Sequence, residues 1–280
     1  MNHADVPGHS PVTIGLENCL DGPPDVLRGA RFGLLVNQAS VDFRYRYSHD
    51  LLAEAFPGQL AALFSPQHGL WSEDQDNMIE TPHGRHPRLG IPAYSLYAEG
   101  RKPSAEMLEG LDCLVVDLQD VGTRVYTYIW TVSYCLEACR EQGIPLVLLD
   151  RPNPLGGDRI EGPRLQTSYS SFVGRAAVPM RHGLTVGEMA GYLNRSMGID
   201  ATLEVVRMSA WQRSMTFDQI GRPWIPPSPN LPRPEGVGLY PGMVLVEGTN
   251  LSEGRGTTTP FEIVGAPFVD PHALAEALGQ

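Results

Sequence analysis

Short apolar runs alternate with helical segments along most of this chain, and this alternation constrains the fold more than any other feature of the sequence. Most of the runs lack the polar alternation of a strand with one solvated face, so they are typical of strands buried on both faces. We predict strands at residues 32–36, 60–64, 93–97, 113–118, 144–149 and 202–208. Strands and helices in this order predict an α/β fold with a mostly parallel sheet covered by helices on both faces.

The helical segments carry recognisable start and stop signals. From Tyr128 to Cys139 apolar residues recur with the period of a helix, and Gly143 supplies a stop. Thr185 and Glu188 form a capping box before another helix. Further helices are predicted over 48–56 with Ser48 as the cap, from Ser104 as the cap to 111, and after the pair Asp270-Pro271.

The composition changes after Trp211. Six prolines lie between Pro223 and Pro234, and such a semi-rigid, extended segment suits a domain junction. Beyond it we predict a short strand over 243–246, a glycine-rich loop and the last helix. We therefore divide the chain into a lead-in over 1–24, a main domain over 25–232 and the start of a small α+β auxiliary domain over 233–280, which we expect to be incomplete.

The charge balance limits the possible partners. The 32 acidic and 21 basic residues give a formal net charge of -11, which argues against nucleic acid and against an anionic membrane surface. The N-terminus lacks the features of a signal peptide, and no run approaches a transmembrane helix. We expect a cytoplasmic protein, or a secreted one if the start is mis-assigned or trimmed; the oligomeric state stays open. Cys19, Cys113, Cys135 and Cys139 lack metal-ligand spacing and are expected to be buried.

Polar side chains follow the carboxyl ends of several predicted strands. They are Asn37 and Gln38, then Gln67, His68 and Glu73, then Asp117 and Asp120, and then Asp150, Arg151 and Asn153. If these strands are parallel neighbours, the groups converge along one edge of the sheet, where ligands bind in open α/β proteins. For any single position, the alternative is that the side chain only caps a helix or satisfies loop backbone.

An arginine and alternating aromatic rings follow Asp120. The Arg124 guanidinium can bind a carboxylate through two hydrogen bonds, and rings such as Tyr126 can stack on the apolar face of a sugar. The alternative is a structural ion pair and core aromatics. The later glycine-rich loop has the wrong spacing for a Walker motif, and we expect it to present polar groups toward the main domain. These groups are Asn250, Glu253 and Arg255.

Several common catalytic motifs are missing from the sequence. There is no G-x-G-x-x-G after the first strand, no G-x-S-x-G, no H-E-x-x-H and no C-x-x-C. Nicotinamide dehydrogenases, the usual α/β serine hydrolases and zincins therefore lose support. His83 and His86 can join His68 as metal ligands, but nothing in the spacing fixes such a site, so no metal and no cofactor are predicted.

A series of motifs resembles the exo-β-N-acetylmuramidases of the NamZ type. They include LFSPQHGLWSEDQDN, LVVDLQDVGTRVYTYIWT, LLDRPNPLGG, HGLTVGEMAGYLN, WIPPSPNLP and EGTNLSEGRGTTTPFE, and the match runs in order from about Arg31 to Asp270. The resemblance implies a Rossmann-like catalytic domain and a smaller auxiliary domain. It also implies removal of terminal N-acetylmuramic acid from the non-reducing end of peptidoglycan fragments, so the expected partner is a muropeptide or another peptidoglycan-derived saccharide.

The resemblance also implies roles for the candidate residues. Glycoside hydrolysis needs carboxyl groups at a cleft, for which we predict Glu73 as the general acid, Asp117 or Asp120 as the second carboxylate, and His68 as an orienting partner. Arg124 and Arg151 are expected to bind the lactyl carboxylate of the substrate. The other predicted substrate contacts are Gln67, Asn77, Tyr126, Asn153, Asn230, Asn250, Glu253 and Arg255.

One departure from the family concerns the acid. Many relatives carry a glutamate where this chain has Gln67, and an amide cannot donate a proton in that role. The prediction therefore moves to Glu73 in the same loop. Two other interpretations stay open: a non-catalytic protein that binds muropeptides, and a metal-dependent hydrolase that uses His68, Asp76 and His83.

Overall fold

The fold is a doubly wound α/β sheet. The computed structural model describes residues 12–72 and 80–279. Its main sheet has the order β3 (Gly84–Arg85), β4 (Pro92–Ser95), β2 (Leu60–Ser65), β1 (Phe32–Val36), β5 (Cys113–Asp117), β6 (Leu146–Leu149) and β9 (Leu203–Val206). All neighbours are parallel except β3 and β4, which are antiparallel. Without β3 this is the Rossmann strand order, so the predicted Rossmann-like sheet is confirmed.

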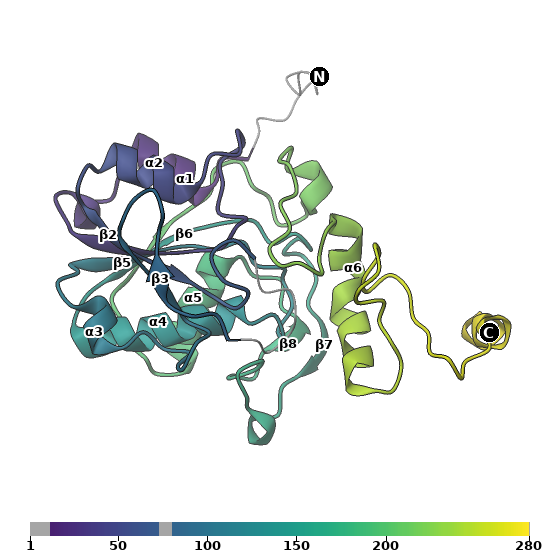
Figure 1. Ribbon diagram of the computed structural model, residues 1–280. Helices are drawn as coiled ribbons and strands as arrows, with labels where there is room; N and C mark the ends of the chain where they lie inside the picture. Colours follow the sequence, from purple (N-terminus) through teal and green to yellow (C-terminus); the bar gives the residue numbers. More distant parts are fainter. Residues whose placement is uncertain (1–11, 73–79, 280) are drawn as a thin grey trace.

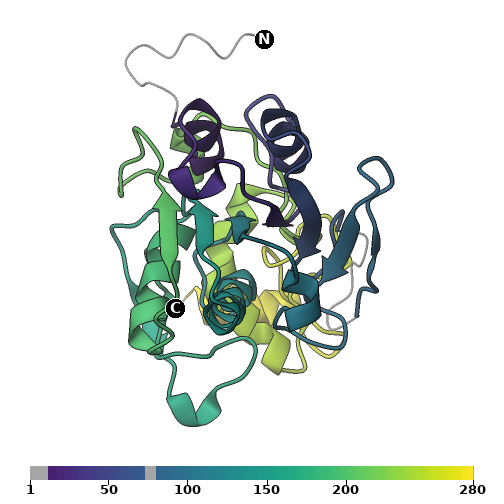
Figure 2. The ribbon, with the colours of Figure 1, turned by 90° about the vertical axis from the view of Figure 1, so that its left-hand side faces the viewer.

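Helices cover both faces of the sheet (Figures 1 and 2). On one face lie α1 (Gly15–Asp21) and α2 (Ser48–Ala55), and on the other lie α3 (Ala105–Leu108), α4 (Tyr128–Gln142) and α5 (Val186–Ser196). In β5 the side chains alternate between two apolar clusters: Leu114 and Val116 join the α4 side, whereas Cys113 and Val115 join the α1 side. Burial on both faces explains why β5 is continuously apolar in sequence.

The predicted helix signals are largely confirmed. Gly143 ends α4 in the left-handed region, at φ 68°, and its N–H donates to the carbonyls of the last turn. Thr185 and Glu188 form the capping box of α5, and the Ser104 hydroxyl accepts from the backbone of α3. The predicted Ser48 cap is wrong, because Ser48 is the first residue of α2 and its buried side chain makes no cap hydrogen bond.

The C-terminal part of the chain is helical where a strand was predicted. Residues 243–246 finish α6 (Pro234–Met243) and begin the 3-10 helix η4 (Val244–Gly248), so the strand prediction is wrong. A short apolar run does not distinguish strand from helix by itself. Val237 and Tyr240 lie three positions apart on α6, and their burial in the α4-side cluster fixes the helix. The last helix, α7 (Pro271–Leu278), begins directly after Asp270, whose side chain caps it, so the helix predicted at Asp270-Pro271 is confirmed.

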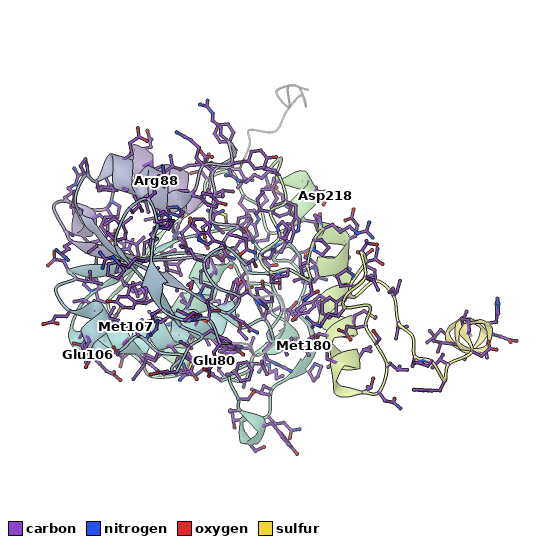
Figure 3. The ribbon with its side chains drawn as sticks, in the orientation of Figure 1. Glu80, Arg88, Glu106, Met107, Met180 and Asp218 are labelled. Atoms are coloured by element: carbon purple, nitrogen blue, oxygen red, sulfur yellow. The ribbon has the colours of Figure 1, made fainter. Side chains whose placement is uncertain are left out.

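A two-stranded hairpin lies outside the main sheet. It pairs β7 (Glu161–Arg164) with β8 (Pro179–Arg181), and short 3-10 turns η1 (Asp25–Leu27), η2 (Thr167–Tyr169) and η3 (Phe217–Gln219) complete the regular structure of the described residues. Charged side chains such as Arg88, Glu106 and Asp218 project from the outer surface (Figure 3). The four cysteines are buried and unpaired, as expected. No helix of the described residues is long and apolar enough to cross a membrane.

Candidate active site

The proline-rich segment runs across the carboxyl ends of the central strands. The Tyr128 hydroxyl donates to the Pro227 carbonyl at 2.7 Å, and the Gln38 side-chain amide donates to the Pro226 carbonyl at 2.5 Å. Gln38 follows β1, and Tyr128 begins the helix after β5. The strand order reverses between β1 and β5, so this segment lies at the switch point where open α/β sheets bind ligands.

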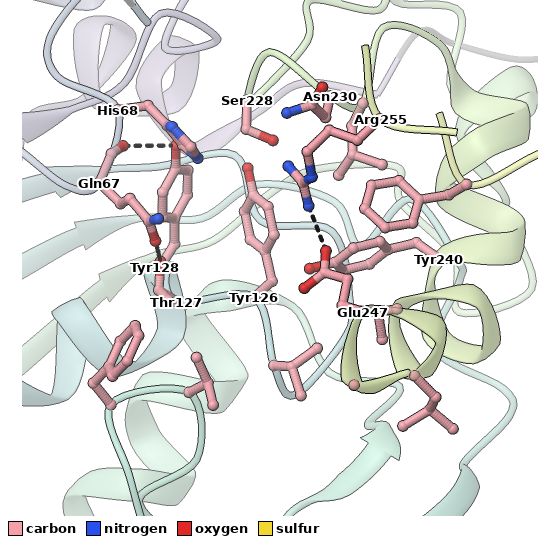
Figure 4. A pocket seen from close by; sticks show the side chains of 18 residues that line it. Gln67, His68, Tyr126, Thr127, Tyr128, Ser228, Asn230, Tyr240, Glu247 and Arg255 are labelled. Atoms are coloured by element: carbon pink, nitrogen blue, oxygen red, sulfur yellow. Dashed lines mark hydrogen bonds and ion pairs between the residues drawn. The ribbon is translucent and has the colours of Figure 1, made fainter. Parts of the chain in front are cut away.

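A cavity of about 470 Å³ opens beside this segment (Figure 4). The loop after β2, the start of α4 and the C-terminal helices meet there, although they are far apart in sequence. Of the residues predicted from the sequence, those that line the cavity are Gln67, His68, Tyr126, Asn230 and Arg255. The structure therefore brings five of the predicted residues into one cavity.

Gln67 and His68 lie on one side of the cavity, and Tyr126 lies between them and the opposite side (Figure 4). The Thr127 hydroxyl donates to the Gln67 side-chain oxygen at 3.1 Å. His68 has a φ of 77°, a left-handed conformation that is strained for a residue other than glycine. Such strain concentrates at functional sites, where the surrounding structure over-determines the backbone.

Glu247 and Arg255 form the opposite side of the cavity. The Arg255 guanidinium pairs with the Glu247 carboxylate through Nη2, and its Nε donates to Glu253 at 3.0 Å. Burial raises the pKa of Glu247 above its usual value, and nearby Glu253 acts in the same direction, whereas Arg255 opposes the rise. The Glu247 side chain retains 33% of its accessible surface, so it remains reachable from the cavity.

Three tyrosines line the cavity between these sides. The Tyr126 ring packs edge-on against Tyr128, with centroids 4.6 Å apart, and against Tyr240, with centroids 6.2 Å apart. Burial raises the pKa of all three phenols above the ordinary value of 10.0. The phenols are therefore neutral, and the rings supply an apolar surface of the kind that packs against a sugar.

Asp117 and Arg151 do not line the cavity, and they pair with each other. Arg151 donates to both Asp117 oxygens, at 2.5 and 2.8 Å, and to the Val41 carbonyl at 3.1 Å. Asp117 is fully buried, and Arg151 is 4% exposed. A bidentate pair of this kind satisfies both groups and joins β5 to the loop after β6.

Asp120 is buried close to the tyrosines but does not line the cavity. One carboxylate oxygen accepts from the Gly122 N–H at 2.7 Å and lies 3.6 Å from Nε2 of His182. The other oxygen has no partner within the described residues. His182 was not predicted from the sequence, and the structure places it beside the candidate second carboxylate.

The side chains of Arg124 and Asn153 donate hydrogen bonds to backbone carbonyls and do not line the cavity. Arg124 donates to the carbonyls of Pro163 and Val178, at 2.7 and 2.8 Å, which connects the segment between β5 and α4 to the β7–β8 hairpin. Asn153 donates to the Leu184 carbonyl at 2.9 Å.

The remaining predicted residues contribute less to this cavity. Asn250 is exposed, and Glu253 reaches the site only through Arg255. Glu73, Asp76 and Asn77 lie outside the described residues. Within the described ranges, no group of three His, Cys, Asp or Glu side chains is placed to hold a metal ion, and His83 accepts a hydrogen bond from the Ser95 backbone at 3.1 Å.

Sequence reasoning missed Glu247, Ser228 and Tyr240, all of which line the cavity. Glu247 stands at the start of the EGTN motif, but in a glycine-rich loop it was indistinguishable from a solvated acid. Ser228 lies in the proline-rich segment, and PSPN gives no local signal for a ligand contact.

Two family models cover most of the chain. The model described as "Exo-beta-N-acetylmuramidase NamZ, N-terminal" matches residues 32–235, and the one described as "Exo-beta-N-acetylmuramidase NamZ, C-terminal" matches residues 238–280. A curated relative, the peptidoglycan β-N-acetylmuramidase NamZ of Bacillus subtilis (strain 168), is 47% identical over 267 residues. The match covers 95% of this chain and 64% of the relative, so the chain spans less than two thirds of that protein's length.

Solved structures of two DUF1343 family proteins from Bacteroides fragilis NCTC 9343 have the same fold. One has a TM-score of 0.86 at 37% identity, and the match covers 97% of this chain and 70% of that protein. The other has a TM-score of 0.79 at 34% identity, and the match covers 92% of this chain and 68% of that protein.

Proposed function

This chain belongs to the exo-β-N-acetylmuramidase NamZ family, and from this premise we propose that it is an exo-acting glycosidase. It releases N-acetylmuramic acid from the non-reducing end of peptidoglycan fragments. The observation that best supports this activity is the cavity at the carboxyl edge of the sheet, in which a carboxylic acid and a guanidinium face tyrosine rings. Its volume of about 470 Å³ lies in the range of small-molecule sites and suits one amino sugar.

Arg255 is the proposed contact for the lactyl carboxylate, the group that distinguishes N-acetylmuramic acid from N-acetylglucosamine. It lines the cavity, and Glu253 and Glu247 fix its guanidinium through Nε and Nη2. A guanidinium held in this way is pre-organised for a carboxylate ligand. Arg124 and Arg151, which the sequence predicted as the lactyl contacts, do not line the cavity and bind carbonyls and Asp117, so we propose that they support the site instead.

The other proposed contacts are the predicted residues that line the cavity. Gln67, Tyr126 and Asn230 bind the sugar, and His68 orients it or a water molecule. Asp120 remains the candidate second carboxylate, because it is buried next to the tyrosines and one of its oxygens has no partner within the described residues. The acid role of Glu73 and the contact of Asn77 remain predictions from the sequence.

The cytoplasmic location is likewise a proposal, which cell fractionation tests.

Chromogenic glycosides test the activity and the role of Arg255 together. The purified protein should hydrolyse an aryl β-N-acetylmuramide faster than the matching β-N-acetylglucosaminide, which lacks the lactyl group. The Arg255→Gln variant should lose about 10- to 100-fold of that preference in kcat/KM, because one charge-assisted contact contributes roughly 1.5–3 kcal/mol. An unchanged ratio in Arg255→Gln would exclude Arg255 as the lactyl contact.

A protein that binds muropeptides without cleaving them is the second candidate, and Gln67 in the cavity favours it, since an amide donates no catalytic proton. Calorimetric binding of N-acetylmuramic acid with no hydrolysis of either glycoside identifies this binder. Full activity after chelation excludes the metal-dependent hydrolase.

A further inference from the structure

We propose that Glu247 is the general acid that protonates the oxygen leaving the sugar. This inference rests on the proposed glycosidase function and adds a catalytic residue to it. It moves the proton donor from the main domain to the end of η4, on the side of the cavity opposite Gln67 (Figure 4).

The composition of the cavity points to Glu247. It is the one carboxylic acid among the described residues that line the cavity. Gln67 cannot donate a catalytic proton. Arg255 stays charged, and the buried phenols, whose pKa values are raised above 10.0, are too weak as acids near neutral pH. The remaining titratable side chain in the described lining is His68, and it lies beside Gln67, on the side of the cavity opposite Glu247 and Arg255.

The surroundings of Glu247 suit a proton donor. Arg255 contacts its Oε1, and no described residue forms a hydrogen bond to its Oε2, so Oε2 is the oxygen that can carry the transferable proton. Its side chain is one-third exposed, at 33%, which gives a substrate access to it. Burial and the nearby Glu253 raise the pKa of this carboxyl group, whereas Arg255 lowers it. The net change is a rise, which increases the protonated fraction at a given pH.

The chemical step balances as a hydrolysis. The bond between C1 and the glycosidic oxygen breaks, its electron pair stays with that oxygen, and the proton on Oε2 moves to it, so the leaving group departs as an alcohol. Water forms a new bond to C1, directly or after the substrate's own N-acetyl oxygen has attacked. The proton that water loses returns through solvent to Glu247, and the net reaction adds one water across the bond.

Leaving-group dependence tests this role, because a good leaving group needs little protonation. The Glu247→Gln variant is compared with wild type on a nitrophenyl β-N-acetylmuramide and on the disaccharide N-acetylmuramyl-N-acetylglucosamine. We expect kcat/KM for the disaccharide to fall by about 10²- to 10⁴-fold, the usual contribution of general acid catalysis, and kcat/KM for the nitrophenyl substrate to fall far less. Activity of wild type should also fall as the pH rises through the pKa of Glu247, and this limb should disappear in the variant.

Glu253→Gln is the matched control. Glu253 also binds Arg255, at 3.0 Å, but does not line the cavity, so its loss should change both substrates by the same factor. Equal losses on both substrates in Glu247→Gln would overturn the inference and reduce Glu247 to a partner of Arg255. The inference would also be overturned if Glu73→Gln lost activity selectively on the disaccharide and Glu247→Gln did not. If the wild-type protein cleaves neither substrate, the proposed glycosidase function itself is wrong. Thermal melts of each variant verify that it is folded.

Discussion

Gly122, next to the candidate second carboxylate, occupies a position where few other residues fit. Gly122 has a φ of 77°, and a Cβ there would lie 2.2 Å from the Asn153 side-chain oxygen. That oxygen accepts from the Leu155 N–H at 2.9 Å, and the Asn153 amide donates to the Leu184 carbonyl, so the side chain cannot easily move away. The Gly122 N–H also binds Asp120. Gly122 therefore positions the candidate second carboxylate through its backbone.

A pair of glycine substitutions tests this requirement. Gly110 has a similar φ of 71°, but no described atom lies within 4 Å of the place a Cβ would take, so Gly110→Ala should reduce the free energy of unfolding by about 1 kcal/mol through backbone strain alone. Gly122→Ala adds the steric clash and should lose about 3 kcal/mol. Urea denaturation measures both. Equal losses would show that the close approach of Asn153 does not matter.

At the scale of one element, α2 brings a buried histidine into an aromatic cluster. The His49 ring stacks on Tyr47, with centroids 5.1 Å apart, and packs edge-on against Trp71 and His86. Burial lowers the pKa of His49 from 6.5 to about 4, and His86 and Arg88 act in the same direction. Asp50 lies 3.4 Å from His49 Nε2, but its carboxylate also pairs with Arg88.

This histidine predicts a stability that depends on pH. Between pH 6.5 and about 4, the unfolded chain binds a proton at His49 that the folded protein does not bind. The free energy of unfolding therefore falls as the pH falls through this window, by about 3 kcal/mol at roughly 1.4 kcal/mol per pKa unit. Urea denaturation at several pH values measures the free energy of unfolding. Its dependence on pH between 6.5 and about 4 should be weaker in His49→Gln than in the exposed control His272→Gln. The same slope in both variants would contradict the assignment.

The elements also show what the sequence could predict. Strands β1, β5 and β6 were predictable because their burial on both faces leaves a continuous apolar run in the local sequence. The run over 243–246 is equally apolar, but its conformation depends on the burial of Val237 and Tyr240 in the apolar cluster on the α4 side of the sheet, which no local pattern records. Tertiary contacts therefore decided the one element whose type was wrongly predicted.

At the scale of the whole molecule, the cavity is assembled from distant parts of the chain. Gln67 and Tyr126 come from the main sheet region, whereas Glu247 and Arg255 come from the C-terminal part. The C-terminal side chains Val237, Tyr240 and Phe261 share one apolar cluster with the helices of the main sheet, which fixes the two sides of the cavity relative to each other. The sequence predicted convergence at the sheet edge, but it could not predict which polar groups the fold would pair with each other, such as Asp117 and Arg151.

The most direct measurement is the release of free sugar from two defined disaccharides, followed by mass spectrometry. We predict that wild type releases N-acetylmuramic acid from N-acetylmuramyl-N-acetylglucosamine. We also predict that wild type leaves N-acetylglucosaminyl-N-acetylmuramic acid intact, because the non-reducing sugar of that isomer has no lactyl carboxylate for Arg255 to bind. Cleavage of both isomers at similar rates, or of neither, would contradict the claim that this cavity is the active site of an exo-acting muramidase.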